Sequence, residues 1–416
     1  MKKLFVSMGL IAAGTAGLQA AYAPGLDSMS ASKVWSVSGT LRGFYDDNYA
    51  TLPHADAKGS FGFEVSPQAG LNLALQQTEL GARYTYGMYY YFDRGNKPID
   101  QSHQFDLWLD HAFTERWQGK VQDSFVIGQE PELIGGGQVR RLNGDIIRNT
   151  ANLTLDTIWT RLFSTELGYG NTVYDYQNSI LAGELNRMEQ SISLDLQWIV
   201  ARNTTAFVGG MFGWADYTAD KVIGQTPPPP APPTKIYYSD DRNSRSYFGY
   251  AGVQHNLLAN LSFNGRVGFQ YTDEYNAGQS SVNPYANLSL IYTYLPGSYA
   301  QVGFTQTQNA TDQVAPDSSG HVTLNQESST LYASLNHKLT PKLMGTLLGR
   351  WQHSIYNGGA YNNQGDDYYS LGLNLSYSFN PHFSAEAGYN LDDVQSQISG
   401  NNYTRNRVYL GVSAAY

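Results

Sequence analysis

The chain has 416 residues, of which 15% are charged, and it contains 42 glycines, 32 tyrosines and no cysteine. A soluble domain usually carries about 25% charged residues, and the absence of cysteine excludes disulfides, an acylated lipoprotein cysteine and thiolate metal sites. The formal net charge of -9 argues against nucleic acid as a partner. The composition fits an exported protein whose fold is held by backbone pairing and packing.

The N-terminus has the pattern of a secretory signal peptide. Two lysines precede an apolar run of about ten residues, and small residues follow. We expect residues 1–20 to be this signal peptide, with cleavage somewhere in 20–23, because the apolar run is too short to anchor the chain in a bilayer. Residues 21–32 then form a periplasmic N-terminal segment, and 33–416 form a single domain. No later run of about 20 apolar residues predicts a transmembrane helix.

The first clear strand is predicted over residues 61–75. Its odd positions, from Phe61 to Leu75, are mostly apolar, and its even positions are polar or small. Side chains alternate across a strand with period two, so this strand has one apolar and one wet face. A slip of one residue would exchange the faces, which fixes the register. Pro67 removes one ladder donor, and we expect a bulge there.

Pairs of such strands recur along the whole chain. A longer polar loop joins the two strands of each pair, and a short turn-prone segment leads to the next pair. The short turns are expected near 76–78, 114–116, 156–158, 201–203, 256–259, 295–298, 339–341 and 380–382. The long loops are expected near 50–59, 93–101, 129–145, 174–186, 217–243, 273–281, 308–325, 357–366 and 392–401. The count gives about 18 strands (16–18), an even number with both ends on the short-turn side.

This pattern predicts an all-β fold, a transmembrane antiparallel β-barrel with short periplasmic turns and long extracellular loops, in the outer membrane of a Gram-negative-type bacterium. A β-propeller also repeats about every 40 residues, but its blades hold four short strands where this chain shows two long ones. Loop 217–243 is rich in proline, which favours an extended spacer or a surface-exposed ligand segment over a strand. The alternation ends in the strand that we interpret as the barrel-assembly signal: Val408, Leu410, Val412, Ala414 and Tyr416.

Lipid accepts the apolar row of each strand, which decides where the side chains point. The rows expected to face outward include Leu80, Ala82, Tyr84, Tyr86, Met88 and Tyr90, and also Ile192, Leu194, Leu196 and Trp198. The rows expected to face inward include Glu79, Arg83, Ser191, Ser193, Asp195 and Gln197. An aromatic girdle is expected near the periplasmic strand ends, at Trp35, Trp117, Phe379 and Phe383.

A barrel of this width leaves an aqueous channel unless a loop or a domain fills it. The inward rows carry charges of both signs, which would orient and filter hydrophilic solutes or, in the alternative, hydrogen-bond across the wall. The lumen-facing charge candidates are Arg42, Glu64, Arg83, Asp106, Asp110, Arg148, Asp195, Arg266, Arg350 and Glu386.

The third long loop, 129–145, offers candidates for a pore constriction. Glu130 and Glu132 precede three glycines, and Arg140 and Arg141 follow them. In this Pro-Glu-aliphatic-glycine character the loop resembles the inward-folded third loop of general diffusion porins. The four charges would then form a transverse field at the narrowest point of the channel. An ordinary surface loop is the alternative.

Adjacent aspartates recur at the outer ends of the predicted strands, and clustered carboxylates suit divalent cations. One pair is Asp240 and Asp241. Because the last strands of a closed barrel neighbour the first, the other three pairs fall on one arc of the outer rim: Asp46, Asp47, Asp366, Asp367, Asp392 and Asp393. Solvated rim charges or turn caps are the alternative, and no cofactor is expected.

An enzymatic barrel is the other class of function to weigh. The eight histidines are scattered, with no His-Glu-x-x-His pattern and no nucleophile elbow. The best pairing of a histidine with a carboxylate is His353 with Asp366, but strand parity places His353 on the lipid-facing row. We therefore expect no enzymatic activity.

The opening strand, residues 38–48, reads Ser-Gly-Thr-Leu-Arg-Gly-Phe-Tyr-Asp-Asp-Asn, and Ser66-Pro67 lies in the next strand. In these features the chain resembles the putative β-barrel porin type 2 family of bacterial outer-membrane proteins. The resemblance implies a membrane barrel and gives no binding residues.

The function we expect is an outer-membrane, porin-like channel for passive diffusion of small hydrophilic solutes or ions. The alternatives are a surface structural protein or adhesin with a plugged barrel, and an export channel for a polysaccharide. The expected partners are outer-membrane lipid and lipopolysaccharide, and the barrel-assembly machinery during biogenesis.

Overall fold

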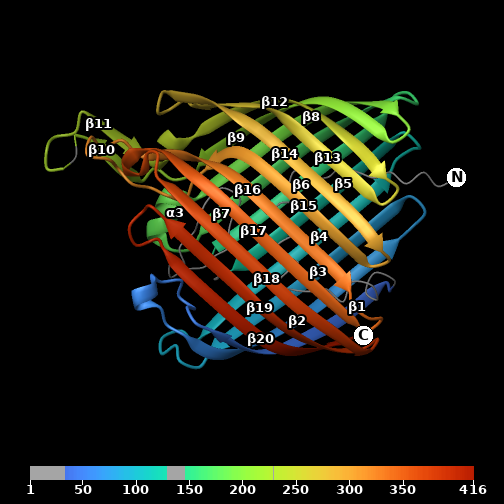
Figure 1. The fold of residues 1–416 in the computed structure, drawn as a ribbon. Coiled ribbons are helices and arrows are strands. Elements are labelled where there is room, and N and C mark those ends of the chain that lie inside the picture. The colour runs from blue at the N-terminus through green and yellow to red at the C-terminus, as the bar shows by residue number, and fades with distance from the viewer. Residues whose placement is uncertain (1–32, 129–145, 228) are drawn as a thin grey trace.

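The computed structural model describes three stretches of the chain: residues 33–128, 146–227 and 229–416. Within them, eighteen strands form one closed antiparallel barrel (Figure 1). The wall closes at β1 (Trp35–Asp46), which pairs with β2 (Ser60–Ala74) on one side and with β20 (Tyr403–Ala415) on the other. The predicted barrel of about 18 antiparallel strands is therefore confirmed.

The other wall strands follow around the barrel in chain order. They are β3 (Thr78–Tyr91), β4 (Ile99–Ala112), β5 (Trp117–Gly128), β6 (Ile146–Ile158), β7 (Phe163–Tyr176), β8 (Arg187–Ala201), β9 (Thr204–Tyr217), β12 (Ser244–Leu258), β13 (Leu261–Glu274), β14 (Gln279–Leu295), β15 (Ser298–Ala310), β16 (Thr323–Lys338), β17 (Leu343–Gly358), β18 (Gly365–Asn380) and β19 (Phe383–Ser396). The shortest, such as β1, has 12 residues, and β14 has 17. A tilted strand needs about 9–11 residues to cross a bilayer, so the strands extend beyond the membrane.

One short turn lies later in the chain than predicted. Residues 156–158 belong to β6, whose ladder with β7 runs as far as Ile158 and Ser164. The turn therefore falls at 159–162, because the alternating pattern continues through the polar Asp156 and Thr157.

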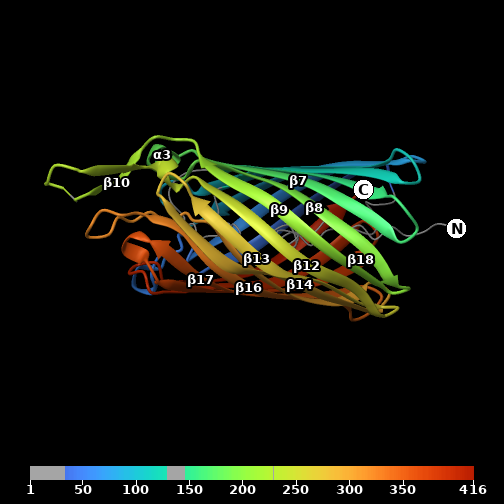
Figure 2. The ribbon, with the colours of Figure 1, turned by 90° about the horizontal axis from the view of Figure 1, so that it is seen from above.

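The loops at the opposite end carry the short helices and a projecting hairpin. The hairpin strands are β10 (Val222–Thr226) and β11 (Lys235–Tyr238), which pair only with each other and extend past the wall (Figures 1 and 2). Its prolines lie between the two strands, in agreement with an extended excursion. The helices are α3 (Ser179–Leu185), η1 (His54–Asp56), η2 (Ser239–Arg242) and η3 (Gly359–Tyr361). No helix in the described parts of the chain is long and apolar enough to cross a membrane.

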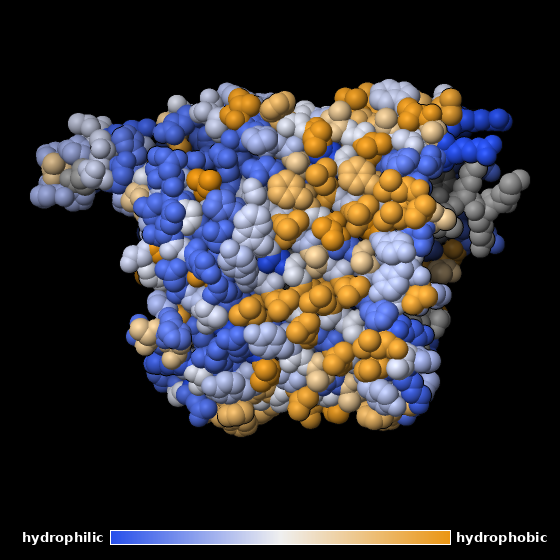
Figure 3. Space-filling view, viewed as in Figure 1, coloured by the Kyte–Doolittle hydropathy of each residue, from blue (hydrophilic) through white to orange (hydrophobic). Residues whose placement is uncertain are grey.

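The two faces of the wall are those that the alternation predicts. On β8, Ile192 and Leu194 are each 46% exposed, whereas Ser193 and Asp195 between and beside them are buried. Figure 3 shows apolar residues gathered over the part of the wall farthest from the β10–β11 hairpin, with hydrophilic residues nearer the hairpin. An ionised side chain in that apolar belt costs about 2–4 kcal/mol at the bilayer midplane, so the belt fixes the register of the strands.

Aromatic side chains mark the turn end of the wall. The exposed Trp35 contacts Tyr416, with ring centroids 5.1 Å apart. Trp117 meets Trp159 edge-on at 5.8 Å. Phe379 and Phe383 are also exposed there. These positions fit a girdle at the membrane interface.

The prediction of a bulge at Pro67 is wrong. The ladder between β2 and β3 skips Ser66 and Pro67, yet the register on both sides of the gap is the same. On the other side, Pro67 stays in register opposite Gly39 of β1. Pro67 therefore interrupts the ladder locally, because it has no N–H, and the strand contains no extra residue at this point.

Candidate solute pathway in the barrel lumen

Most of the predicted lumen-facing charges form ion pairs, some between neighbouring strands and some that pass over the strands between them. Arg42 on β1 contacts Glu64 on β2 at 3.0 Å and reaches past β20 to Glu386 on β19 at 2.6 Å. Gly411 on β20 leaves the room for this reach, since a Cβ there would lie 2.7 Å from Cγ of Arg42. The other pairs are Arg83 with Asp106 at 2.9 Å and Arg266 with Asp195 at 3.1 Å. These charges therefore hydrogen-bond across the wall.

Three predicted charges are placed differently. Asp110 on β4 accepts a hydrogen bond from Nε2 of Gln118 at 2.5 Å. Arg148 on β6 and Arg350 on β17 both border a cavity inside the barrel. The structure thus separates the ion-paired charges that join strands of the wall from Arg350, which borders the cavity without a carboxylate partner in the described ranges.

The outer end of β15 separates from β14 toward the lumen while it stays paired with β16 as far as Ala310. β14 and β15 pair only between Ala286–Gln306 and Leu295–Ser298. Beyond that point, Gln270 on β13 donates from Nε2 to the carbonyl of Gln308 at 2.8 Å and accepts the Gln308 N–H at 2.9 Å. Gln270 belongs to an inward row and is buried, so the backbone of β15 lies on the lumen side of β14. The amide side chain takes the place of a ladder partner.

The chain then continues across the lumen as residues 311–322, which we call the inward segment. Its Asp312 accepts a hydrogen bond from Nη1 of Arg187 on β8 at 2.5 Å and another from the Tyr176 hydroxyl on β7 at 3.0 Å. The Arg187 and Asp312 side chains are each only 3% exposed. Strands β9, β12, β13 and β14 separate β8 from β15 around the wall. The ion pair therefore joins distant parts of the barrel through its interior.

A second arginine holds the start of the inward segment. Arg242 on η2 is buried, and its guanidinium donates to the carbonyl of Thr311 while it lies 4.4 Å from the ring centroid of Tyr217. The Tyr217 hydroxyl donates to the same carbonyl at 3.2 Å. Burial lowers the pKa of the Arg242 guanidinium, because removal from water disfavours the charged form.

Apolar contacts complete the attachment of the inward segment. Val314 packs against the buried cluster of Tyr174, Tyr176 and Leu185 on β7 and α3. It also packs against a second cluster that contains Val322 and the base of the β10–β11 hairpin. The inward segment is therefore built into the barrel at both polar and apolar contacts.

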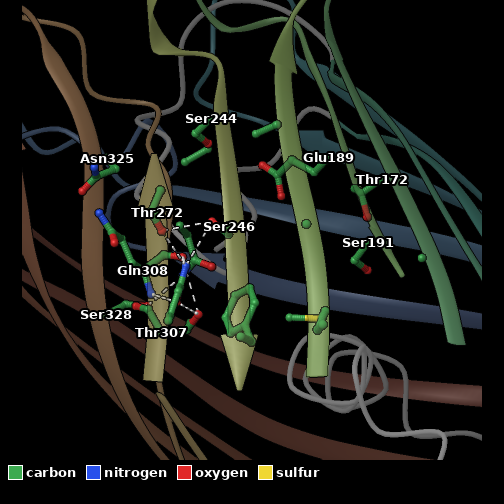
Figure 4. Close-up of a pocket in the computed structure, with 18 of the residues that line it drawn as sticks. Thr172, Glu189, Ser191, Ser244, Ser246, Thr272, Thr307, Gln308, Asn325 and Ser328 are labelled. Carbon is green, nitrogen blue, oxygen red and sulfur yellow. Dashed lines mark hydrogen bonds between the residues drawn. The ribbon is translucent and has the colours of Figure 1, made fainter. Parts of the chain in front are cut away.

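The cavity beneath this segment has a volume of about 380 Å³ and lies between β6–β9 and β12–β17. Hydroxyl and amide side chains dominate its lining, and Figure 4 shows Thr172, Glu189 and Ser191 on one side with Gln308 and Asn325 on the other. The residues that flank the inward segment, Ala310 and Leu324, also border the cavity. A polar solute in the lumen would meet these groups directly below the segment.

The sequence of the last strands carries a family signature. Residues 293–416 match the family Putative beta-barrel porin 2. This confirms the resemblance noted for the opening strands, on a different part of the chain. The matched stretch contains β15 to β20, and with them the inward segment and Arg350. No curated protein matches the chain in sequence.

The whole barrel is similar in outline to solved outer-membrane proteins. The outer membrane protein OpdK from Pseudomonas aeruginosa is 10% identical, with 92% of this chain and 99% of that chain covered and a TM-score of 0.42. A BenF-like porin from Pseudomonas fluorescens Pf-5 is 12% identical over 92% and 99%, with a TM-score of 0.46. A mutant of the ferric enterobactin receptor from Pseudomonas aeruginosa is 10% identical over 91% and 80%, with a TM-score of 0.45.

The constriction predicted from the sequence lies outside the described residues. That prediction named Glu130, Glu132, Arg140 and Arg141 in 129–145, and it stays a prediction. Sequence reasoning treated 308–325 as an ordinary long loop and missed the inward segment. It also missed the groups that fix this segment, which are Arg187, Arg242, Gln270 and Asp312.

The rim aspartates are bound by other side chains. Asp46 is fully buried and contacts Arg405 at 2.6 Å and Arg407 at 3.0 Å. Asp366 accepts from the Tyr356 hydroxyl at 2.6 Å, and the further contacts join Asp47 to Asn406, Asp367 to His353, Asp392 to Tyr368 and Asp393 to Thr404. Across the described ranges, no group of three or more histidine or acidic side chains is placed to hold a metal ion. The geometry therefore gives the cation hypothesis no support.

The predicted pairing of His353 with Asp366 is wrong, because His353 contacts the adjacent Asp367. Nδ1 of His353 lies 3.0 Å from Asp367, and Nε1 of Trp351 donates to the same carboxylate at 3.0 Å. Asp366 belongs to the inward row and Asp367 to the outward row, since adjacent residues of a strand point to opposite faces. His353 and Asp367 therefore lie together on the outward face of the wall.

Proposed function

We propose that this chain is an outer-membrane channel through which small hydrophilic solutes or ions diffuse passively, with the inward segment at its constriction. The observation that carries the proposal is the polar cavity inside a closed wall of eighteen strands. A barrel of this size is too wide for its own inward side chains to fill. The family match to porins supports the same class of function.

The proposed location is the outer membrane of a Gram-negative-type bacterium, reached by secretory export. The apolar belt would contact lipid and lipopolysaccharide. The last strand presents Val408, Leu410, Val412 and Tyr416 on the exposed face, where we propose that the barrel-assembly machinery binds. The proposal contains no catalytic step.

A planar-bilayer recording tests the channel. We compare the wild type with a variant that lacks residues 313–321 and with a control that lacks 227–233, which lies in the projecting hairpin. We expect steady wild-type conductance, a higher conductance in the first deletion, and no change in the control. The reversal potential across a KCl gradient reports the ion preference.

A plugged structural barrel is the second candidate, and the buried Arg187–Asp312 anchor favours it. Such a barrel would be silent in the wild type and would conduct only after residues 313–321 are removed. If the wild type and both deletions are all silent although folded, the channel proposal fails.

A further inference from the structure

Arg350 differs from the paired arginines of the barrel wall. Its side chain is buried, with 8% exposed, and it donates from Nη2 to Oε1 of Gln352 at 2.5 Å. Its Nε atom is buried without a hydrogen-bond partner, and no carboxylate in the described ranges lies within ion-pair distance of it. By contrast, carboxylates lie within 3.1 Å of Arg42, Arg187 and Arg266. A buried guanidinium ordinarily requires such a partner.

The unpaired guanidinium borders the lumen cavity. Arg350 and Gln352 line it together with neighbouring side chains of β16, including Thr330 and Tyr332. Thr330 stands opposite Gln352 in the ladder, and Tyr332 stands opposite Arg350. A solute in the cavity would therefore meet the Arg350 donors beside hydroxyl groups.

The charges around the cavity are unbalanced. Its lining within the described ranges contains a single carboxylate, Glu189, whereas the buried Arg350 has no carboxylate partner there. Glu189 already contacts Arg187 at 2.7 Å. The cavity therefore favours an anion, and a planar guanidinium with free N–H groups matches carboxylate and phosphate oxygens.

We propose that Arg350 is the binding residue of an anion subsite in the lumen, which takes a small hydroxylated solute that carries a carboxylate or phosphate group. The inference rests on the proposed function in that the solute reaches the subsite through the channel. The hydroxyl and amide lining binds the solute hydroxyls, and the guanidinium binds its oxyanion.

Equilibrium binding to the refolded protein in detergent tests the subsite without any need for conduction. The probes are gluconate, glucose 6-phosphate and glucose, measured by isothermal titration calorimetry. We expect the wild type to bind at least one of the two anions and to bind glucose at least tenfold more weakly. Binding of gluconate alone identifies a carboxylate ligand, and binding of glucose 6-phosphate alone identifies a phosphate ligand.

Two variants remove the free charge in different ways. Arg350→Gln deletes it, and Gln352→Glu keeps Arg350 but supplies a carboxylate where Oε1 already contacts it. Both should weaken anion binding by about tenfold or more, the range of a charge-assisted hydrogen bond. The control Arg83→Gln makes the same charge change at a lumen-facing arginine paired with Asp106, outside the cavity lining, and should bind as the wild type does.

The proposal is overturned if the wild type binds neither anion more tightly than glucose, or if either variant keeps wild-type affinity. The channel proposal and the subsite proposal can each fail without the other. Silence in the bilayer with Arg350-dependent binding removes only the channel, and conductance without anion binding removes only the subsite.

Discussion

The substitution Asp312→Asn tests whether the Arg187 ion pair fixes the inward segment. Removing one partner of a buried pair usually costs about 3–5 kcal/mol, because the other charge stays buried. Here Arg187 keeps Glu189 at 2.7 Å, and that side chain is 32% exposed. We therefore expect the lower end, about 3 kcal/mol. At about 1.4 kcal/mol per factor of ten, the population of the detached segment should rise about 100-fold.

Hydrogen exchange measured by mass spectrometry on a peptide that covers 311–322 reports this population. The matched control is Asp317→Asn in the same segment. Its carboxylate is partly exposed and contacts its own turn, at the N–H groups of Ser319 and His321 and at Nδ1 of His321. We expect fast exchange in Asp312→Asn and wild-type exchange in the control. Wild-type exchange in Asp312→Asn would refute the claim that the ion pair holds the segment in the lumen.

Three further changes test the wall. Asp46→Asn should lower the free energy of unfolding of the barrel by about 3–5 kcal/mol, because two buried arginines lose their shared carboxylate. Heat-dependent gel migration measures the loss of stability, and the control Asp47→Asn should have a smaller effect. Leu194→Arg puts a charge on the lipid face and should cost about 2–4 kcal/mol in urea unfolding from vesicles, and an unchanged midpoint would contradict the assigned facing. Gln270→Leu removes both hydrogen bonds to the Gln308 backbone, which should lower the free energy of local opening at the outer end of β15 by about 1–3 kcal/mol. Amide exchange at 307–310 should become faster. Unchanged exchange would show that β15 does not need these two hydrogen bonds.

The sequence shows on which face of a strand each side chain lies, and the predictions used only part of this information. Period two placed Ile192 and Leu194 outside and Ser193 and Asp195 inside, as the structure confirms. The same rule splits the adjacent aspartate pairs within β18 and β19 between the two faces of each strand. Applied to Asp366 and Asp367, it would have identified Asp367 as the partner of the outward-facing His353.

The candidate site was much less accessible to sequence reasoning. Arg187 and Asp312 are 125 positions apart in the chain, and nothing in their local sequence links them. Gln270 looks like any other polar residue of an inward row, and it becomes a backbone partner only because β15 separates from β14. Arg350 was expected to face the lumen and it borders the cavity, but its lack of a carboxylate partner in the described ranges depends on every residue around it.

The sequence by itself determined a closed barrel of about 18 strands (16–18) and the facing of its wall, because lipid outside and water inside impose period two on each strand. The tertiary structure alone decided what lies within the lumen. The path of the inward segment depends on contacts among β7, β8, η2 and β13, which are brought together only when the wall closes. Which charges remain free to meet a solute follows from those same contacts.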